Sequence, residues 1–234
     1  MLITRQTIAA ARKMTRQDLP QTEGGTEYID VTSWPVHLDL PFRARRVDEI
    51  RSEITMHITS VKGGFGLSAR QVSRWEALLE TSEARKMALL ERYSGCAYHW
   101  VVSRELGIIR NHDPLIRTSH GNRGNRGIGF AIDVGIGEEL GPEFANQARR
   151  GLILAVDDLR TRTGEVVNLT AHRCFSSKRR ADPGEIVWSQ VVRPVAKVLS
   201  DATRIDYSLA EDSGRPIPRS WDPSALFDDR GRRV

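Results

Sequence analysis

The 234-residue chain has little cysteine, few aromatic residues and no long apolar run, and each shortage excludes a class of protein. Two cysteines, Cys96 and Cys174, are too few for a disulfide framework, so we expect both to be reduced thiols. No apolar stretch approaches the length of a membrane-spanning helix. Residues 1–20 have no apolar core before a small-residue cleavage site, so we expect no signal peptide and a protein made in a cytoplasm.

Aromatic residues make up 6% of the chain, which leaves no obvious platform for stacking nucleic-acid bases. No segment matches a recognised nucleic-acid-binding motif either. The formal net charge is nevertheless +5, and this favours an anionic partner such as a nucleic acid, a membrane surface or a cell-wall polymer. Composition alone does not choose among these three partners.

Hydrophobic periodicity predicts one folded domain, residues 50–205, between an N-terminal extension (residues 1–49) and a loose, charged C-terminal tail (residues 206–234). We expect strands at 50–60, 96–102, 108–109, 128–134 and 166–171, and helices at 68–93, 142–162 and 185–200, the last kinked at Pro194. The order β-α-β-β-β-α-β-α predicts an α/β fold in which a mixed β-sheet is flanked by helices.

The stretch AHRCFSSKRRADPGEIVW, residues 171–188, carries the clearest chemical signal. His172 is followed ten residues later by Asp182, and Pro183 pushes Asp182 out of the α region. A loop of this size can bring an imidazole and a carboxylate onto one cation, and both are ordinary zinc ligands. A catalytic zinc usually has three protein ligands and one open position, so a third ligand must come from elsewhere in the chain.

His57 is the candidate for that third ligand. It lies in a strand in which Ile54 and Met56 alternate with polar residues, so it faces the side opposite them. Taken alone, His57 is better interpreted as a surface histidine on a half-buried strand. We interpret Cys174 as a neighbour of the metal rather than a ligand, because Asp182 has the better context. If Cys174 also bound zinc, the site would be closed and structural rather than catalytic.

Two further segments carry polar residues that could contact a substrate. In CAYHWVV, residues 96–102, Tyr98 and His99 face opposite sides of a predicted hairpin strand. The glycine-rich SHGNRGNRGIG has no periodicity, is typical of a functional loop and contains His120 and Asn125. His99 could equally well be a histidine packed in a strand without contact to a substrate. His120 and Asn125 could equally well be solvated loop residues.

Taken together, these segments resemble the zinc-dependent N-acetylmuramoyl-L-alanine amidases. That family includes phage lysozyme-type amidases, bacterial muropeptide amidases and animal peptidoglycan-recognition proteins. The resemblance covers roughly residues 50–200 and lies in the helices and in ITMHITS, GCAYHWVVSRELGII, SHGNRGNRGIGFAIDVG and AHRCFSSKRRADPGEIVW.

The resemblance implies that His57, His172 and Asp182 bind Zn²⁺ and that Tyr98 and Arg180 act in catalysis. Tyr98 falls on the tyrosine that lysozyme-type members use near the metal. With an ordinary pKa of about 10 it is a poor base at neutral pH, so we expect it to orient water or the intermediate. Arg180 stands where the family usually has lysine, which keeps the charge but changes its reach.

One strand position decides the implied subtype. Some bacterial members carry a glutamate after the Gly-Ile-Gly step, and here Ala131 takes that place. The resemblance therefore implies the tyrosine subtype, with Asp133 as an alternative substitute for the glutamate. His99, His120 and Asn125 are the candidates for contact with the substrate.

The resemblance implies hydrolysis of the amide bond between N-acetylmuramic acid and L-alanine in peptidoglycan, by a monomer that needs Zn²⁺. An endolysin, held in the cytoplasm until lysis and then acting on the cell wall, is the first expectation. An injected antibacterial toxin and a muropeptide-recycling enzyme are alternatives. A non-catalytic peptidoglycan-binding module is disfavoured because all three ligand positions are filled, and nucleic-acid binding through the arginine-rich segments is a third hypothesis.

Overall fold

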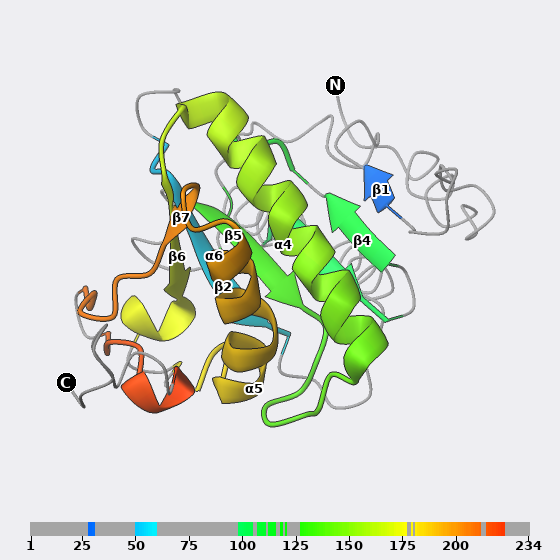
Figure 1. The fold of residues 1–234 in the computed structure, drawn as a ribbon, viewed down its shortest axis with the longest axis vertical. Helices are drawn as coiled ribbons and strands as arrows, with labels where there is room; N and C mark the ends of the chain where they lie inside the picture. The colour runs from blue at the N-terminus through cyan, green and yellow to red at the C-terminus, as the bar shows by residue number, and fades with distance from the viewer. Residues whose placement is uncertain are drawn as a thin grey trace, which may run out of the picture.

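The computed structural model describes the central domain of the chain and a three-residue strand before it (Figure 1). The described residues are 28–30 (backbone only), 50–59, 98–104, 107–110, 112–115, 118, 120, 127–176, 179, 181–211 and 214–222. The predicted helix 68–93, Cys96, Asn125 and Arg180 lie outside these residues.

The described strands form one sheet in the order β1-β4-β3-β5-β2-β6-β7. Their bounds are Tyr28–Asp30 (β1), Glu53–Ile58 (β2), Trp100–Ser103 (β3), Gly107–Arg110 (β4), Ile128–Ile132 (β5), Val167–Ala171 (β6) and Thr203–Arg204 (β7). All neighbours are parallel except β3 and β4, which form the predicted hairpin. The prediction of a mixed sheet is confirmed, and β1 shows that the expected N-terminal extension contributes an edge strand.

Strand β2 is more buried than its alternating sequence predicts. It lies between β5 and β6, and all six of its residues are buried. Ile54 and Met56 belong to the hydrophobic core, whereas Glu53, Thr55 and His57 are buried polar residues. The interpretation of His57 as a surface histidine is therefore wrong, since none of this side chain is exposed.

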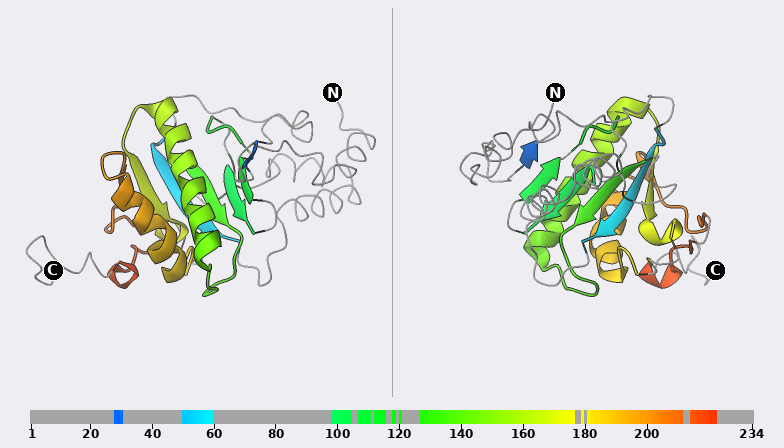
Figure 2. Two further views of the ribbon diagram at one scale, coloured as in Figure 1. Left: turned by 45° about the vertical axis from the view of Figure 1, so that its right-hand side comes forward. Right: turned by 180° about the vertical axis from the view of Figure 1, so that it is seen from behind.

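Helix α4, Pro142–Thr163, lies diagonally across one face of the sheet (Figures 1 and 2). The prediction of an amphipathic helix at 142–162 is confirmed, because Leu152, Val156 and Leu159 are all fully buried. Gly151 allows the close approach: a Cβ atom there would lie 2.8 Å from the Val102 side chain. Among the described helices none is both long and apolar enough to cross a membrane.

The predicted last helix contains a local irregularity before Pro194. It runs through α5 (Glu185–Val187), a π-helical turn (Trp188–Val192) and α6 (Arg193–Val198). Proline has no N–H for the carbonyl four residues before it, which is that of Gln190. Arg149 Nε of helix α4 donates to this carbonyl at 2.6 Å, so the α4 side chain supplies the hydrogen bond that Pro194 cannot.

The chain after α6 packs against the domain, so the expectation of a loose tail is wrong for its described part. Ile217 and Trp221 are buried in the core, at 2% and 8% exposure. Asp222 accepts a hydrogen bond from the Tyr207 hydroxyl and forms an ion pair with Arg193 of α6. The boundaries 1–49, 50–205 and 206–234 themselves stay predictions.

Candidate metal centre

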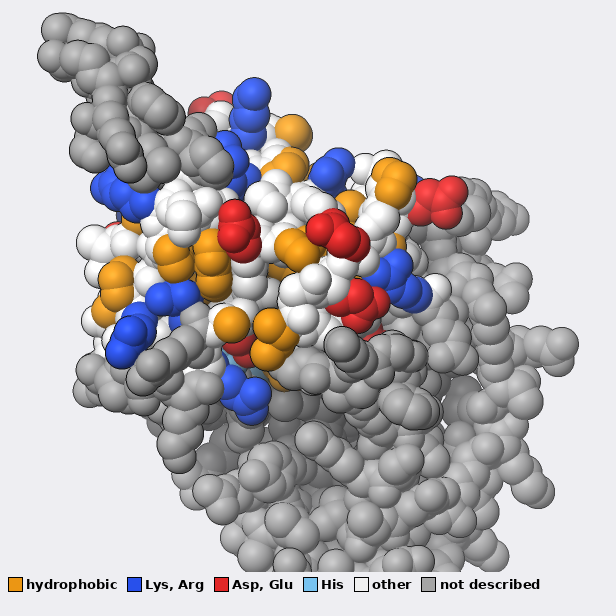
Figure 3. All heavy atoms as spheres, turned by 90° about the horizontal axis from the view of Figure 1, so that it is seen from below, with side chains coloured by type: hydrophobic (Ala, Val, Ile, Leu, Met, Phe, Trp, Pro, Cys, Tyr) orange, Lys and Arg blue, Asp and Glu red, His pale blue; other side chains and the backbone are white. Residues whose placement is uncertain are grey.

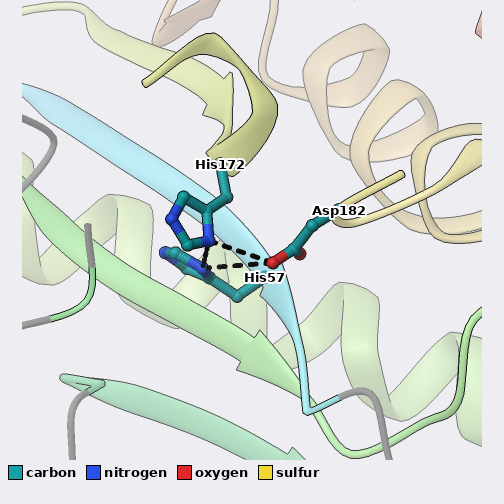
Figure 4. A group of neighbouring side chains, drawn as sticks. All are labelled: His57, His172 and Asp182. Atoms are coloured by element: carbon teal, nitrogen blue, oxygen red, sulfur yellow. Dashed lines mark hydrogen bonds and ion pairs between the residues drawn. The ribbon is translucent and has the colours of Figure 1, made fainter. Parts of the chain in front are cut away.

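Three residues far apart in the sequence meet at the carboxyl ends of β2 and β6 (Figure 4). His57 is the fifth residue of β2, and His172 follows the last residue of β6 directly. Because β2 and β6 are parallel neighbours, their carboxyl ends lie at the same edge of the sheet. Asp182 reaches the same point from the loop that precedes α5.

The potential ligand atoms of these residues form a small triangle. His172 Nδ1 lies 3.0 Å from both His57 Nδ1 and Asp182 Oδ2, and the third edge, from His57 Nδ1 to Asp182 Oδ2, is 3.8 Å. All three residues are buried, with exposures of 0%, 9% and 5% for His57, His172 and Asp182. Two imidazole nitrogens and a carboxylate oxygen therefore converge on one point beneath the surface.

Backbone hydrogen bonds hold the Asp182 carboxylate in this orientation. The Ile58 N–H donates to Asp182 Oδ1 at 2.9 Å, which leaves Oδ2 directed at the histidines. The Asp182 carbonyl accepts from the Arg173 N–H at 3.2 Å, so the loop is tied to the turn that carries His172. Burial would raise the pKa of Asp182, but its hydrogen bond with His172 and the nearby His57 imidazole outweigh that effect and hold the pKa below its usual value.

Burial has the opposite consequence for the histidine in the strand. Burial, reinforced by the neighbouring His172, lowers the pKa of His57 to about 4. At neutral pH the ring is therefore uncharged and can offer a nitrogen lone pair to a cation. Metal ligands must be deprotonated, and an uncharged imidazole beside an ionised carboxylate meets that condition.

The dimensions of the triangle fit a zinc ion. Ligands of a tetrahedral zinc with bonds of about 2.0–2.1 Å are roughly 3.3 Å apart, close to the observed edges of 3.0, 3.0 and 3.8 Å. Cys174 is not among the converging residues, and burial raises the pKa of its thiol to about 11. The three side chains thus could hold a metal with three protein ligands, which leaves a fourth position for water or substrate.

Of the two predicted catalytic residues, the structure describes one. Tyr98 is partly buried just before β3, and its ring centroid lies 4.9 Å from that of His57. It therefore lies beside the candidate ligand His57, and its role in catalysis stays a prediction. Arg180 falls outside the described residues, although it is two residues from Asp182 in the sequence.

The predicted substrate residues His99 and His120 are both buried beside the cluster. His99 is fully buried, and its Nδ1 accepts a hydrogen bond from the Gly129 N–H at 3.0 Å. His120 is 4% exposed, and its Nδ1 lies 3.1 Å from His57 Nε2. Their contact with a substrate stays a prediction, as does that of Asn125, which is outside the described residues.

The position of Asp133 bears on the question of the missing glutamate. Ala131 is the direct neighbour of His57 across β2 and β5. Asp133 is buried just beyond the end of β5, and its carboxylate accepts a hydrogen bond from the Thr59 hydroxyl at 2.7 Å. The Thr59 hydroxyl thus gives this buried carboxylate a hydrogen-bond donor, and Asp133 as a substitute for the glutamate stays a prediction.

Sequence reasoning did not find the residues that support the turn carrying His172. The Arg215 N–H donates to the Arg173 carbonyl and the Glu211 N–H to the Cys174 carbonyl, both at 2.8 Å. Gly214 packs directly on the same turn. The sequence gives little sign of these contacts, because the residues that make them lie about 40 positions from His172 and have no periodic pattern.

The surface below the strand ends carries mixed charges. Figure 3 shows basic, acidic and hydrophobic side chains interspersed over the described part of this face, with none gathered into one patch. The described part of this face therefore contains no concentrated basic surface, although the net charge of the chain is +5.

No protein-family model and no curated protein matches the chain. Solved structures do. The endolysin N-acetylmuramoyl-L-alanine amidase LysCS from Clostridium intestinale is 15% identical, with a TM-score of 0.47, over 74% of this chain and 95% of that one. Bumblebee PGRP-SA is 12% identical, with a TM-score of 0.49, over 76% and 98%. Peptidoglycan recognition protein-LE in complex with tracheal cytotoxin is 16% identical, with a TM-score of 0.47, over 73% and 93%. The first of these proteins is an amidase and the other two are peptidoglycan-recognition proteins.

Proposed function

We propose that this chain is a zinc-dependent amidase that hydrolyses the bond between N-acetylmuramic acid and L-alanine in peptidoglycan. The observation that carries the proposal is the convergence of His57, His172 and Asp182 within 4.8 Å of one another. The choice of bond comes from the motifs, which resemble those of the amidase family in the same order along the chain.

The donor set suits hydrolysis better than a purely structural metal. When bound by three protein ligands, zinc supplies a Lewis acid and lowers the pKa of a water in its open position towards about 7. Two uncharged imidazoles and one carboxylate leave a net positive charge at such a site. The buried ligands exclude bulk water on the protein side, so electrostatic interactions at the open position are stronger than in solution.

Tyr98 and Arg180 would act on the reacting amide. The Tyr98 ring lies beside His57, with ring centroids 4.9 Å apart, and its hydroxyl would orient the attacking water or hydrogen-bond the tetrahedral intermediate. Arg180, two residues before the ligand Asp182, would stabilise the oxyanion that develops on the carbonyl. One such donor is typically worth about 3–4 kcal/mol of transition-state stabilisation.

We further propose that the protein is made in a cytoplasm and acts on the wall after release, as an endolysin does. Injected toxins and muropeptide-recycling enzymes would use the same chemistry. A non-catalytic binding module is the competing function. It is disfavoured because binding alone does not require three convergent ligands with an open fourth position.

Digestion of purified peptidoglycan tests the proposal and separates three kinds of lytic enzyme. We expect new N-terminal L-alanine without new reducing sugar ends, because an amidase leaves the glycan strands intact. A glycosidase would instead release reducing ends, and an endopeptidase would cut within the stem peptide or cross-bridge. Mass spectrometry of the products identifies the bond directly.

Two controls tie the activity to the metal centre. A chelator should stop alanine release, and added Zn²⁺ should restore it. His57→Ala should lower both bound zinc and activity, whereas Glu165→Gln on the exposed turn after α4 should change neither. Intact muramyl–alanine linkages after lysis would overturn the amidase assignment even if zinc is bound, and full zinc content in His57→Ala would remove His57 from the site.

A further inference from the structure

The second nitrogen of His57 has a partner of its own. His57 Nδ1 faces His172 and Asp182, while His57 Nε2 lies 3.1 Å from His120 Nδ1. The two rings are nearly perpendicular, at 86°, with centroids 5.2 Å apart. His57 and His120 are both almost completely buried, so little water competes for this hydrogen bond.

The direction of the hydrogen bond follows from the far side of His120. His120 Nε2 lies 3.4 Å from the carbonyl oxygen of Gly127, and a backbone carbonyl can only accept. His120 Nε2 must therefore carry the proton in this contact. In an uncharged ring that leaves His120 Nδ1 as an acceptor, so His57 Nε2 must donate to it.

This chain of contacts selects one tautomer of His57. An uncharged imidazole carries its single ring proton on either Nδ1 or Nε2. With the proton on Nε2, the Nδ1 lone pair of His57 points at His172 Nδ1 and Asp182 Oδ2, where a metal would bind. The other tautomer would place a proton in that position and block the ligand.

Two glycines give His120 the space that it needs. A Cβ atom on Gly129 would lie 2.6 Å from Cγ of His120, so the imidazole rests directly on the backbone of β5. A Cβ atom on Gly127 would lie 2.4 Å from the carbonyl oxygen of Glu53, so Gly127 can pack against β2 only without a side chain. The Gly-Ile-Gly step thus forms both the floor under His120 and its hydrogen-bond acceptor.

We propose that His120 is a positioning residue of the metal centre: it accepts the Nε2 proton of His57 and holds that ring in the tautomer and orientation that present Nδ1 to the metal. In this role His120 acts through His57 and need not touch the substrate. The inference rests on the proposed function in one respect, that His57 is a zinc ligand. Loss of such a partner of a metal-bound histidine typically lowers metal affinity about 10- to 100-fold.

Three variants at buried histidines test the role. His120→Phe keeps a ring but removes the acceptor, and it should weaken zinc binding about 10- to 100-fold in competition with a chelator. His120→Asn places an amide oxygen near the position of Nδ1 and should recover most of the affinity. His112→Phe makes the same substitution at a buried histidine that packs against His99, and it should leave zinc affinity within about two-fold of the wild type. Wild-type affinity in a folded His120→Phe protein would overturn the proposal.

The tautomers can also be measured in the unaltered protein without any metal. Long-range ¹H–¹⁵N correlation spectra of the metal-free protein should show the proton of both His57 and His120 on Nε2. A proton on Nδ1 of either ring overturns the positioning role. This readout separates the two proposals, because failure of the wild-type protein to bind zinc would sink the zinc-amidase function while the tautomer measurement would still decide how His120 acts on His57.

Discussion

Glu53, the first residue of β2, should make the stability of this protein depend strongly on pH. The residue is 5% exposed, and its Oε1 has no hydrogen-bond partner among the residues that the structure describes. Burial raises the pKa of Glu53 from its ordinary value of 4.5 to about 7; the charge of Arg51 opposes the rise and that of Glu211 adds to it. Arg51 itself forms an ion pair with Glu211, with Nη1 and Oε1 3.1 Å apart.

The sign of the effect follows from proton binding. Between about pH 4.5 and 7 the unfolded chain has released the Glu53 proton while the folded protein still holds it. The folded state therefore binds more protons, and the free energy of unfolding falls as pH rises through this window. A shift from 4.5 to about 7 corresponds to roughly 3 kcal/mol, which is lost in full above about pH 7.

Glu53→Gln removes the titration and keeps the size of the side chain. We expect the variant and the wild type to differ little near pH 5 and the variant to be more stable by about 3 kcal/mol at pH 8. Urea unfolding at pH 5, 6, 7 and 8, with a chelator present throughout, measures both proteins. The difference between their free energies of unfolding at each pH cancels the contribution of His57 and Asp182, because both proteins contain these two residues.

The exposed Glu165→Gln provides a matched control with the same chemical change. Its unfolding free energy should follow the wild type within about 0.5 kcal/mol at every pH. If the difference between wild type and Glu53→Gln is constant from pH 5 to 8, Glu53 does not change ionisation in this window and the reasoning above is wrong.

Two further predictions concern catalysis and the turn that carries His172. Tyr98→Phe and Arg180→Ala should keep zinc bound while kcat falls about 10- to 1000-fold, and unchanged kcat in both variants would show that neither residue acts on the transition state. Gly214→Ala should lower the free energy of unfolding by at least 2 kcal/mol, because the new Cβ would lie 2.0 Å from the Cys174 carbonyl oxygen, a backbone atom. Gly137 has a φ of 73°, and a Cβ atom added there would have no atom of the described residues within 4 Å. Gly137→Ala should therefore cost only about 1 kcal/mol in the same urea titration, and equal losses in the two variants would contradict the packing argument.

Local patterns in the sequence were sufficient to predict the framework of the site. The alternation around Ile54 and Met56 predicts β2, and the apolar spacing through Leu152 and Val156 predicts α4. Turn chemistry also predicts where Asp182 stands, because Pro183 and Gly184 interrupt the chain directly after it. These features depend on neighbours a few residues apart, which is the range that periodicity reports.

Contacts across long sequence separations could not be predicted in the same way. The edge strands β1 and β7 have three and two residues, too short for a period to be visible. The burial of the chain around Trp221 depends on Arg173 and Trp188, which lie more than 30 positions away. His120 shows the same limit: its place beside His57 is set by the backbone of Gly129, and the sequence signals only a loop followed by small residues.

The same polar face of β2 contains a residue that supports the site and one that costs stability. Glu53, Thr55 and His57 point to one side of the strand, and a strand buried on both faces usually has apolar residues at all positions. Thr55 lies 3.4 Å from the Thr170 hydroxyl, and His57 has His120 and the candidate ligands.

Glu53 Oε1 has no hydrogen-bond donor among the described residues. At the other end of the same strand, the Asp182 carboxylate receives hydrogen bonds from Ile58 and His172. Glu53 and Asp182 are equally buried, yet the pKa of Glu53 is raised and the pKa of Asp182 is lowered. The difference lies in the hydrogen-bond donors that Asp182 has and Glu53 Oε1 lacks. No contact among the described residues links the Glu53 side chain to the metal centre. Glu53→Gln should therefore gain stability above pH 7 without loss of zinc affinity, and a joint loss would show that the two ends of β2 are coupled.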